Sequence, residues 1–514
     1  MSKFSLVKSA AVLGIDAYIV NVECNLSRAE LPRFITVGLP EGAVRESKER
    51  VWAAVKNMGY YIPSNKIVVN LAPADIKKEG SAFDLPIAIG ILCAANLVPK
   101  DKLKDYIMLG ELSLDGALRG IKGTLPISVS VKDSGIKGII LPVENAKEAA
   151  ITGELSIIGV KSLRETIDFL NDDYSPEPFH IDVQALFEEH RRYQLDFSDV
   201  KGQENVKRSL EVAAAGGHNL IMIGPPGSGK TMLAKRFPSI LPNLTLEEAL
   251  ETTKIHSVAG LIPSGQGIIA TRPFRSPHHT ISDAALVGGG KIPRPGEVSL
   301  SNHGVLFLDE FPEFKKNVLE VLRQPLENGT VTISRAQMSL TYPSSFMLVA
   351  AMNPCPCGYS TDPNNECTCS QSQIQKYMSR ISGPLLDRID IHIEVPAVRF
   401  SDLASKSPSE TSKFIRERVQ NAREIQTKRF KELKGVYANA HMETKLIKKY
   451  CQIDKAGESL LRTAITKLGL SARAYDRILK VSRTIADLAC MEQIRPEHLS
   501  EAIQYRSLDR QLWL

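Results

Sequence analysis

The pattern of apolar and polar positions divides the first 170 residues into alternating strand-like and helix-like segments. Apolar side chains occupy every second position from Tyr18 to Leu26, which predicts a strand with one buried face. From Val44 to Met58 they recur at helical spacing, which predicts a helix. By the same criteria we expect strands at 67–71, 107–112, 138–141 and 155–160, and helices at 84–97, 124–134 and 162–171. Residues 1–170 are therefore predicted to form a mixed α/β domain.

Two changes of pattern follow this region. Residues 171–195 contain two prolines and many charges with little periodicity, which predicts a linker. A second α/β domain is predicted over residues 196–400, and a helical C-terminal domain over 401–514. Within the latter, a basic run over 413–434 indicates a solvated helix face or, alternatively, a surface for nucleic acid or another subunit.

Composition excludes several classes of protein. The 514 residues are too many for a small disulfide-stapled scaffold. The 64 basic and 58 acidic residues leave a net charge of +6, which is too small for a protein that coats polyanions. The longest apolar run, 85–98, falls short of the ~20 residues of a membrane helix. Because no secretory signal is recognised, we expect a soluble, cytoplasmic protein without a membrane partner.

The strongest chemical signal is a phosphate-binding loop. An apolar strand candidate at 219–223 runs into Gly-Pro-Pro-Gly-Ser-Gly-Lys-Thr, followed by helix-forming residues. In such a loop, backbone N–H groups surround a polyphosphate at a helix N-terminus, Lys230 supplies positive charge and Thr231 a Mg²⁺ ligand. The predicted nucleotide-binding residues are Gly224, Pro225, Pro226, Gly227, Ser228, Gly229, Lys230, Thr231 and Asp309.

Two carboxylates complete the predicted hydrolytic centre. The apolar run 305–308 ends in Asp309 and Glu310, so both emerge at the carboxyl end of a strand, where α/β sheets bind ligands. We expect Asp309 to hold Mg²⁺, directly or through water, and Glu310 to polarise the attacking water. These residues predict an enzyme that hydrolyses ATP with Mg²⁺.

Two further polar residues are candidates for the same centre. Asn353 follows the apolar strand 346–352 and could orient the lytic water or contact the γ-phosphate; a simple turn residue is the alternative. Arg388 suits a finger that stabilises charge on a neighbouring subunit's γ-phosphate. Its alternative is an intramolecular ion pair with Asp387 or Asp390.

Four cysteines crowd into one polar segment. Their order is Cys-x-Cys, nine residues, then Cys-x-Cys, in a loop rich in Pro, Gly, Asp and Asn. Four thiolates could close a tetrahedral structural zinc site, and four reduced loop thiols are the alternative. The predicted ligands are Cys355, Cys357, Cys367 and Cys369.

Together these motifs resemble those of AAA+ ATPases, and specifically the magnesium-chelatase-like family known as ComM or YifB. The resemblance covers essentially the whole chain. It rests on the phosphate loop and on segments 199–203, 274–290, 353–358, 383–388 and 470–477. It implies a multidomain α/β protein, with a Lon-protease-like N-terminal α+β domain, a P-loop motor and a helical lid.

The resemblance also implies roles for single residues. Asn353 is similar to sensor 1, Arg388 to the arginine finger acting in trans, and Arg473 to the lid's sensor 2, which touches the γ-phosphate in cis. The long gap between Lys230 and Asp309 resembles a helix-2 insert within about 254–300. Strands 330–334 and 338–342 resemble the hairpin that precedes sensor 1 in this clade.

The N-terminal domain resembles the Lon-protease fold but departs from its catalytic pair. In the register Lys-x-Gly-x-Ser, Ala82 stands where the nucleophile belongs, and Thr124 replaces the lysine. Ser81 lies one residue away, so a shifted alignment stays open. We expect a role in recruitment or assembly rather than peptidase activity.

The family resemblance implies a homo-hexameric ring that moves along DNA and promotes branch migration in natural transformation and homologous recombination. Branched DNA or junctions of single-stranded and duplex DNA, and the recombinase machinery, are the implied partners. Two rivals remain open: a chelatase-type motor that serves metal insertion into a tetrapyrrole, and a protein-remodelling ATPase.

Contacts with DNA are expected in the central channel, to which the insert and the hairpin of this clade project. His278 and His279 are predicted to belong to a polar loop facing the pore rather than to a metal site. For Arg335, capping of the hairpin turn is the alternative. The predicted DNA contacts are Arg335, Arg272, Arg275 and Lys291.

Overall fold

The chain folds into two compact units, which are described separately. The computed structural model describes residues 3–31, 33–61, 65–78, 80–191, 193–263, 265–290, 293–335, 338–362, 365–397, 409–433, 435–469 and 471–508. Unit 1 comprises Met1–Arg191 and Ala249–Ala270, and unit 2 comprises Arg192–Glu248 and Thr271–Leu514. Unit 1 therefore contains a segment that lies in sequence between the phosphate loop and Asp309.

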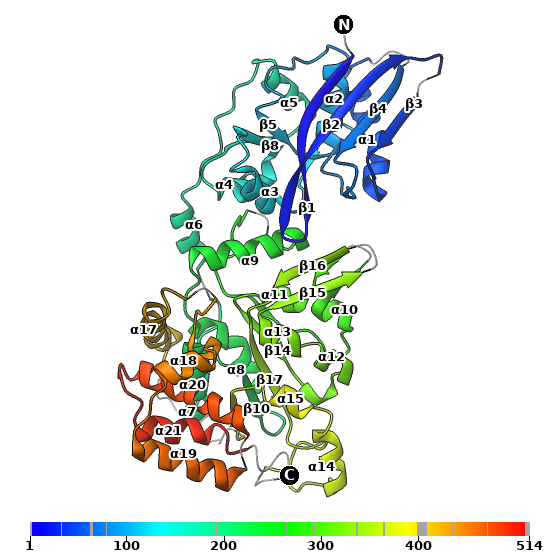
Figure 1. Cartoon of the computed structure of the whole chain (residues 1–514). Coiled ribbons are helices and arrows are strands. Elements are labelled where there is room, and N and C mark those ends of the chain that lie inside the picture. Colours follow the sequence, from blue (N-terminus) through cyan, green and yellow to red (C-terminus); the bar gives the residue numbers. More distant parts are fainter. Residues whose placement is uncertain are drawn as a thin grey trace. The chain divides into compact units, whose positions relative to one another are not determined.

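Unit 1 is built on a seven-stranded mixed sheet with the strand order β3-β4-β2-β1-β5-β8-β9. Its long antiparallel strands β1 and β2 lie side by side in the middle of the sheet (Figure 1), with Phe4 opposite Asn25 and Leu13 opposite Asp16. The strands of unit 1 are β1 (Phe4–Leu13), β2 (Asp16–Arg28), β3 (Arg33–Val37), β4 (Asn65–Ala72), β5 (Tyr106–Met108), β6 (Glu111–Leu112), β7 (Leu118–Arg119), β8 (Gly138–Pro142) and β9 (Ser156–Val160). The strands predicted at 18–26, 67–71, 138–141 and 155–160 are confirmed. The strand predicted at 107–112 is divided into β5 and β6, which belong to different sheets, and β1, β3 and β7 were not expected.

Helices cover this sheet, and α2 is buried on all sides because its sequence is apolar all round. The helices of unit 1 are α1 (Gly42–Asn57), α2 (Asp84–Ala94), α3 (Thr124–Val131), α4 (Ala146–Ala150), α5 (Leu163–Leu170) and α6 (Val183–His190). The helices predicted from periodicity are confirmed. Helix α6 lies within the predicted linker, where Asp182 caps its first turn by accepting a hydrogen bond from the Ala185 N–H.

The predicted helix-2 insert divides between the two units. Helix α9 (Leu246–Ala259) leads into it, and residues 249–270 fold with unit 1. There the Ser257 hydroxyl donates to the carboxylate of the buried Glu148, and the Gly123 N–H donates to the Ser257 carbonyl over 3.2 Å. Only the part beyond residue 270 belongs to unit 2.

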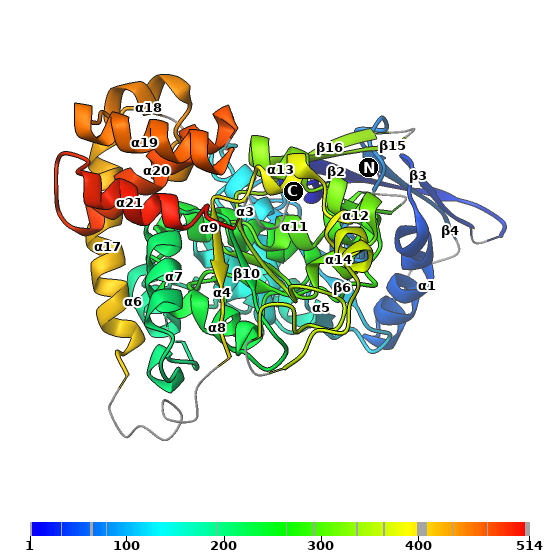
Figure 2. The ribbon, with the colours of Figure 1, turned by 90° about the horizontal axis from the view of Figure 1, so that it is seen from below.

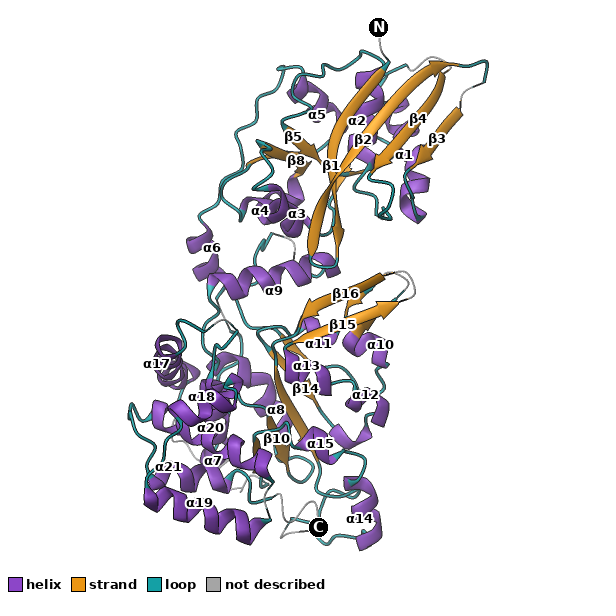
Figure 3. Ribbon diagram, viewed as in Figure 1, coloured by secondary structure: helices purple, strands orange, loops and turns teal. Residues whose placement is uncertain are grey.

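Unit 2 contains a parallel five-stranded sheet in the order β11-β14-β17-β10-β18. Its strands β10, β14 and β17 are short and almost wholly buried, as is usual where helices cover both faces. A separate hairpin of β15 and β16 is visible in Figure 3. The strands of unit 2 are β10 (Leu220–Ile223), β11 (Phe274–Arg275), β12 (Gly288–Gly289), β13 (Arg294–Pro295), β14 (Val305–Leu308), β15 (Thr330–Arg335), β16 (Met338–Pro343), β17 (Met347–Met352) and β18 (Ile391–Glu394). The predicted core strands and the hairpin are confirmed.

The C-terminal part of unit 2 is helical, as predicted, and Figure 2 shows α17 running alongside α7. The helices of unit 2 are α7 (Glu204–Gly216), α8 (Lys230–Arg236), α10 (Asp283–Val287), α11 (Glu297–Leu300), α12 (Lys316–Glu320), α13 (Arg323–Asn328), α14 (Gln371–Met378), α15 (Gly383–Leu386), α17 (Ser412–Arg429), α18 (Thr444–Tyr450), α19 (Lys455–Leu468), α20 (Ala472–Leu488) and α21 (Pro496–Gln504). None of the helices in the described ranges is long and apolar enough to cross a membrane.

Three arginines of the basic run in α17 contact other elements of unit 2. Arg418 pairs with Glu211 of α7, and Arg423 donates to the carbonyl oxygens of Ala214 and Ala215. Arg429 pairs with Asp487 at 2.5 Å. These arginines fix α17 against α7 and α20. Lys413 and Lys428 of the same helix are exposed, so a solvated face and a surface for nucleic acid or another subunit both stay open for the rest of the run.

Candidate active site

The phosphate loop lies between the carboxyl end of β10 and the first residue of α8. Gly227 and Gly229 have φ angles of 77° and 88°, a region that glycine adopts at little cost. At Gly224 an added Cβ would lie 2.1 Å from the Val395 carbonyl oxygen, so a larger residue would displace the neighbouring strand. The loop thus exposes backbone N–H groups at a helix N-terminus, as anion binding requires.

Lys230 lies at the centre of the loop and is 8% exposed. Its ammonium donates to the carbonyl oxygens of Gly224 and Pro225 over 2.7 and 2.9 Å, and to Asn353 Oδ1 over 3.2 Å. Burial lowers the pKa of Lys230, and the nearby Asp309 opposes this shift. The structure therefore brings the loop lysine and Asn353, from the end of β17, into direct contact.

The residues expected to hold Mg²⁺ also meet. Thr231 Oγ1 donates to Asp309 Oδ2 over 2.6 Å, although the two residues are 78 positions apart. A hydroxyl and a carboxylate are the oxygen ligands that Mg²⁺ takes in nucleotide sites. Together with the open space at Gly227, where a Cβ would meet nothing within 4 Å, this donor set fits a magnesium nucleotide.

Glu310 has a partner that the sequence did not predict. Its Oε2 lies 3.0 Å from Nδ1 of His279, and the His279 ring lies against that of His278 at a centroid distance of 4.1 Å, tilted by 35°. Strands β11 and β14 are parallel neighbours, so the chain that follows Arg275 reaches the same sheet edge as Glu310. The two adjacent histidines were visible in the sequence as candidate site residues. Their distance from Glu310 along the chain, however, gave no indication that they contact this carboxylate.

Arg388 lies at the opposite edge of the sheet. Strands β10 and β18 are parallel, with Leu220 opposite Ile391, so a residue before Ile391 is at the amino edge while the phosphate loop is at the carboxyl edge. Arg388 is 7% exposed and pairs with Glu327, which replaces the two aspartates considered as alternatives. It also donates to the Pro384 carbonyl over 2.5 Å.

Arg473 lies near Arg388 rather than near the phosphate loop. Its guanidinium is 3.5 Å from the carboxylate of Asp387. The four residues of β10 separate the two sheet edges by about 13 Å at 3.3 Å per residue. The pair with Asp387 places Arg473 near Arg388 in this structure, and its role as sensor 2 in cis stays a prediction.

The predicted DNA contacts differ in their environments. Arg272 is buried, donates to three backbone carbonyls and pairs with Glu248 at 3.0 Å, so we correct its assignment from channel cation to structural residue. Arg275 is half-buried in a two-point pair with Glu297. Arg335 is exposed at the end of β15, and Lys291 lies outside the described residues.

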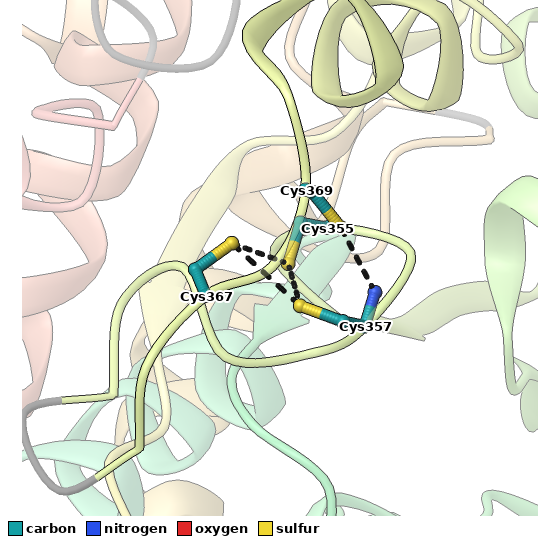
Figure 4. Close-up of side chains that lie close together, drawn as sticks. All are labelled: Cys355, Cys357, Cys367 and Cys369. Atoms are coloured by element: carbon teal, nitrogen blue, oxygen red, sulfur yellow. Dashed lines mark hydrogen bonds between the residues drawn. The ribbon is translucent and has the colours of Figure 1, made fainter.

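The four clustered cysteines lie close together in space (Figure 4). Their sulfur atoms are all within 4.8 Å of one another, and three of the pairs are 3.3, 3.7 and 3.6 Å apart. The backbone N–H of Tyr359 contributes most to lowering the pKa of Cys357 to about 5. The arrangement provides four sulfur ligands of the kind that a structural zinc ion takes.

The region that resembles the Lon catalytic pair is occupied by other contacts. The Ser81 hydroxyl donates to the carboxylate of Glu111, and the ammonium of Lys78 donates to the Ile76 carbonyl over 2.6 Å. Thr124 is fully buried. Ser81 is thus engaged with Glu111, and the position of the expected lysine is held by the buried Thr124.

Sequence comparison identifies the family. Over 512 residues the chain is 44% identical to Competence protein ComM of Haemophilus influenzae, an alignment that covers 99% of this chain and 98% of that protein. It is also 44% identical to the uncharacterized protein YifB of Escherichia coli K12 over 513 residues, with the same coverage. The chain belongs to the ComM/YifB family. Within ComM/YifB proteins the motor carries the AAA+ architecture, and this membership indicates ATPase activity.

Several matches cover only parts of the chain. Residues 196–403 match the family model described as magnesium chelatase, subunit ChlI, and residues 409–506 match its C-terminal model. Residues 22–145 match a model described as subunit ChlI of Mg-chelatase. Lon protease 2 of Bacillus subtilis is 32% identical over 142 residues, which cover 27% of this chain and 25% of that protein. The N-terminal region of this ComM/YifB protein is thus Lon-like.

Proposed function

We propose that this protein is an ATP-dependent, hexameric DNA motor that promotes branch migration of recombination intermediates, as in natural transformation. The observation that carries the proposal is the meeting of Lys230, Thr231, Asp309, Glu310 and Asn353 at one sheet edge. This hydrolytic centre lies in a chain that aligns over nearly its whole length with a protein named for competence.

In this proposal each residue of the centre has a distinct task. The backbone of 224–229 binds the polyphosphate, and Lys230 exchanges its carbonyl partners for phosphate oxygens. Glu310 orients the attacking water and accepts its proton, while Asn353 contacts the γ-phosphate. Bound Mg²⁺, held by Thr231 and Asp309, supplies charge neutralisation.

The placement of Arg388 supports the proposed assembly into a ring. Arg388 lies at the sheet edge opposite the phosphate loop of its own chain, about 13 Å away along the strand, which supports a role at the site of a neighbouring subunit once it exchanges Glu327 for phosphate oxygens. A guanidinium supplied in trans stabilises charge on the transferred phosphoryl group. The active species is then an oligomer, for which we propose a hexamer.

DNA is the proposed track of the motor. Arg335, at the end of a hairpin that stands apart from the core sheet, is an exposed cation available to a phosphate backbone. Such contacts position DNA without reading bases, so binding is expected to be independent of sequence and to weaken with salt.

One experiment separates this function from its rivals. ATP turnover is measured with no DNA, with linear duplex, and with forked and four-way junctions. Stimulation that is strongest with junctions supports the DNA motor, and loss of labelled strands from a four-way junction confirms branch migration. A chelatase-type motor, which the chelatase family models favour as the second candidate, predicts no response to any DNA.

A further inference from the structure

The four cysteines lie in the connection between the Asn353 end of β17 and helix α14. Cys355 follows Asn353 by two residues, and Cys369 directly precedes Ser370, which caps α14 through a reciprocal capping box. Both ends of the cysteine segment are therefore held by regular structure. One of these ends carries a residue that contacts Lys230.

The sulfur geometry fits a single tetrahedral ion. Four ligands at the usual Zn–S distance of about 2.3 Å place sulfur atoms about 3.8 Å apart. The closest recorded pairs here are 3.3, 3.6 and 3.7 Å, and all four cysteines are free of disulfides. Thiolates this close repel one another strongly unless a cation lies between them.

The surroundings of the sulfur atoms also suit metal binding. The Gly358 N–H donates to Cys355 Sγ over 3.2 Å, and the Cys357 N–H donates to Cys369 Sγ over 3.3 Å, as Figure 4 shows for the second bond. Such backbone donors stabilise thiolates and fix their direction around a metal. Cys355 is fully buried, whereas the other three are partly exposed, which gives an ion a path of entry.

The same segment touches the phosphate loop. Gly358 has a φ of +91°, and a Cβ added there would lie 2.5 Å from Cδ of Pro226 and 3.8 Å from Cγ of Asn353. The backbone at Gly358 thus packs closely on the phosphate loop and near the side chain of Asn353. A change in the path of the cysteine segment would be transmitted to both.

We propose that Cys355, Cys357, Cys367 and Cys369 bind one Zn²⁺ ion, and that this ion holds Gly358 against Pro226 and Asn353, so that zinc occupancy sets the rate of ATP hydrolysis. Four protein ligands leave no open coordination position, so the ion acts on the structure and takes no part in the chemistry. The inference rests on the ATPase part of the proposed function and is independent of DNA.

The test compares the double variant Cys367→Ser/Cys369→Ser with the control Cys490→Ser, an exposed cysteine in the same unit. The altered pair lies at the far end of the segment from Asn353. Metal content is measured by mass spectrometry on protein purified without chelators, turnover is measured without DNA, and hydrogen exchange is followed over 355–362 and the phosphate loop. Wild-type protein stripped with a chelator and returned to Mg²⁺ buffer, with or without Zn²⁺, guards against a folding defect in the variant.

We expect one zinc per chain in wild type and in the control, and none in the double variant. We expect kcat to fall about tenfold or more in the variant and in stripped wild type, because displacement of positioning groups by about 1 Å has effects of this size. Exchange in both segments should rise, and added Zn²⁺ should restore the stripped protein. Absence of zinc from wild type, iron in its place, or unchanged turnover after zinc removal would overturn the proposal. Since no measurement includes DNA, a failure of DNA stimulation leaves this result unaffected.

Discussion

His279 Nδ1 lies 3.0 Å from Oε2 of Glu310, so the carboxylate that should polarise water is already engaged by an imidazole. The histidine belongs to the segment that follows β11, and the carboxylate follows the neighbouring strand β14. Glu310 itself adopts a left-handed backbone conformation, with φ of 53°. The pair links the polar segment after β11 to the hydrolytic step.

The His279→Ala variant should hydrolyse ATP faster than wild type in the absence of DNA. Removing one hydrogen bond of about 0.5–1.5 kcal/mol frees a carboxylate oxygen, which corresponds to roughly a two- to tenfold rise in kcat. KM for ATP should change little, because the contact of His279 is with Glu310, which is expected to act in hydrolysis and not in nucleotide binding. His279→Asn, which keeps a donor, should remain near the wild-type rate. A fall in kcat for His279→Ala would show instead that the imidazole holds Glu310 in its productive position.

The Glu310→Gln variant should bind ATP and fail to turn it over. The amide keeps the shape of the side chain but cannot accept a proton, and loss of a general base lowers rates by about 10²–10⁴. Lys230→Ala should instead lose binding, since it removes the cation at the centre of the loop. Fluorescent-nucleotide titration and phosphate release distinguish the two variants. Near wild-type hydrolysis by Glu310→Gln would exclude Glu310 as the base.

Arg388→Ala should assemble and bind ATP but hydrolyse it about a hundredfold more slowly or worse, because arginine fingers contribute at least this much. Mixing it with Glu310→Gln should restore part of the activity, since some interfaces then carry both intact groups. Arg388 also pairs with Glu327, so Glu327→Gln serves as the control and should retain turnover. Mixtures that stay inactive across all ratios would argue against action in trans.

Arg335→Ala should keep basal ATPase and assembly but lose stimulation by junction DNA. Loss of one phosphate contact should lower the slope of log affinity against log salt by about one. Arg462, 80% exposed on α19, gives a matched control: Arg462→Ala removes an equal charge outside the hairpin. An unchanged salt slope and unchanged branch migration in Arg335→Ala would remove this residue from the DNA path.

Arg477→Met should destabilise unit 2 strongly. Asp390 is 3% exposed and pairs with Arg477 and, at 3.1 Å, with His218. Burial alone would raise the pKa of Asp390, but Arg477 and His218 outweigh burial and lower it. An unpaired buried carboxylate costs about 3–5 kcal/mol.

Hydrogen exchange in peptides of α20 during urea unfolding measures how much the free energy of unfolding falls in Arg477→Met. Arg473→Met, which breaks a largely exposed pair on the same helix, should cost well under about 1 kcal/mol. Because the folded pKa of Asp390 lies below its unfolded value, its contribution is present at neutral pH. It should be lost only as the pH falls below about 4. Equal effects of the two methionine variants would contradict this account.

The sequence predicted local structure better than it predicted partners. The phosphate loop and the buried run at 305–308 were recognisable because backbone conformation and strand burial are encoded within a few residues. The contact of His279 with Glu310 depends on the pairing of β11 with β14, which spacing does not reveal.

The arginines illustrate the same limit. Arg272 was expected to be exposed, but its burial depends on Glu248 and on three carbonyls distant in sequence. For Arg473, the motif suggested a role without indicating the edge of the sheet at which the side chain lies. In both cases the position of the side chain depends on residues distant in sequence, so a local sequence pattern does not predict it.

The path of the chain makes the Lon-like region inseparable from the motor. It passes from unit 1 to unit 2 at 191–192, returns at 248–249 and leaves again at 270–271. A truncation that begins at residue 192 would leave Ser257 without Glu148, and Gly265 without the lysine at 147 that donates to its carbonyl. The Lon-like region therefore cannot be replaced by itself, in evolution or in the laboratory. Any replacement must also pack against residues 249–270, which lie within the ATPase sequence.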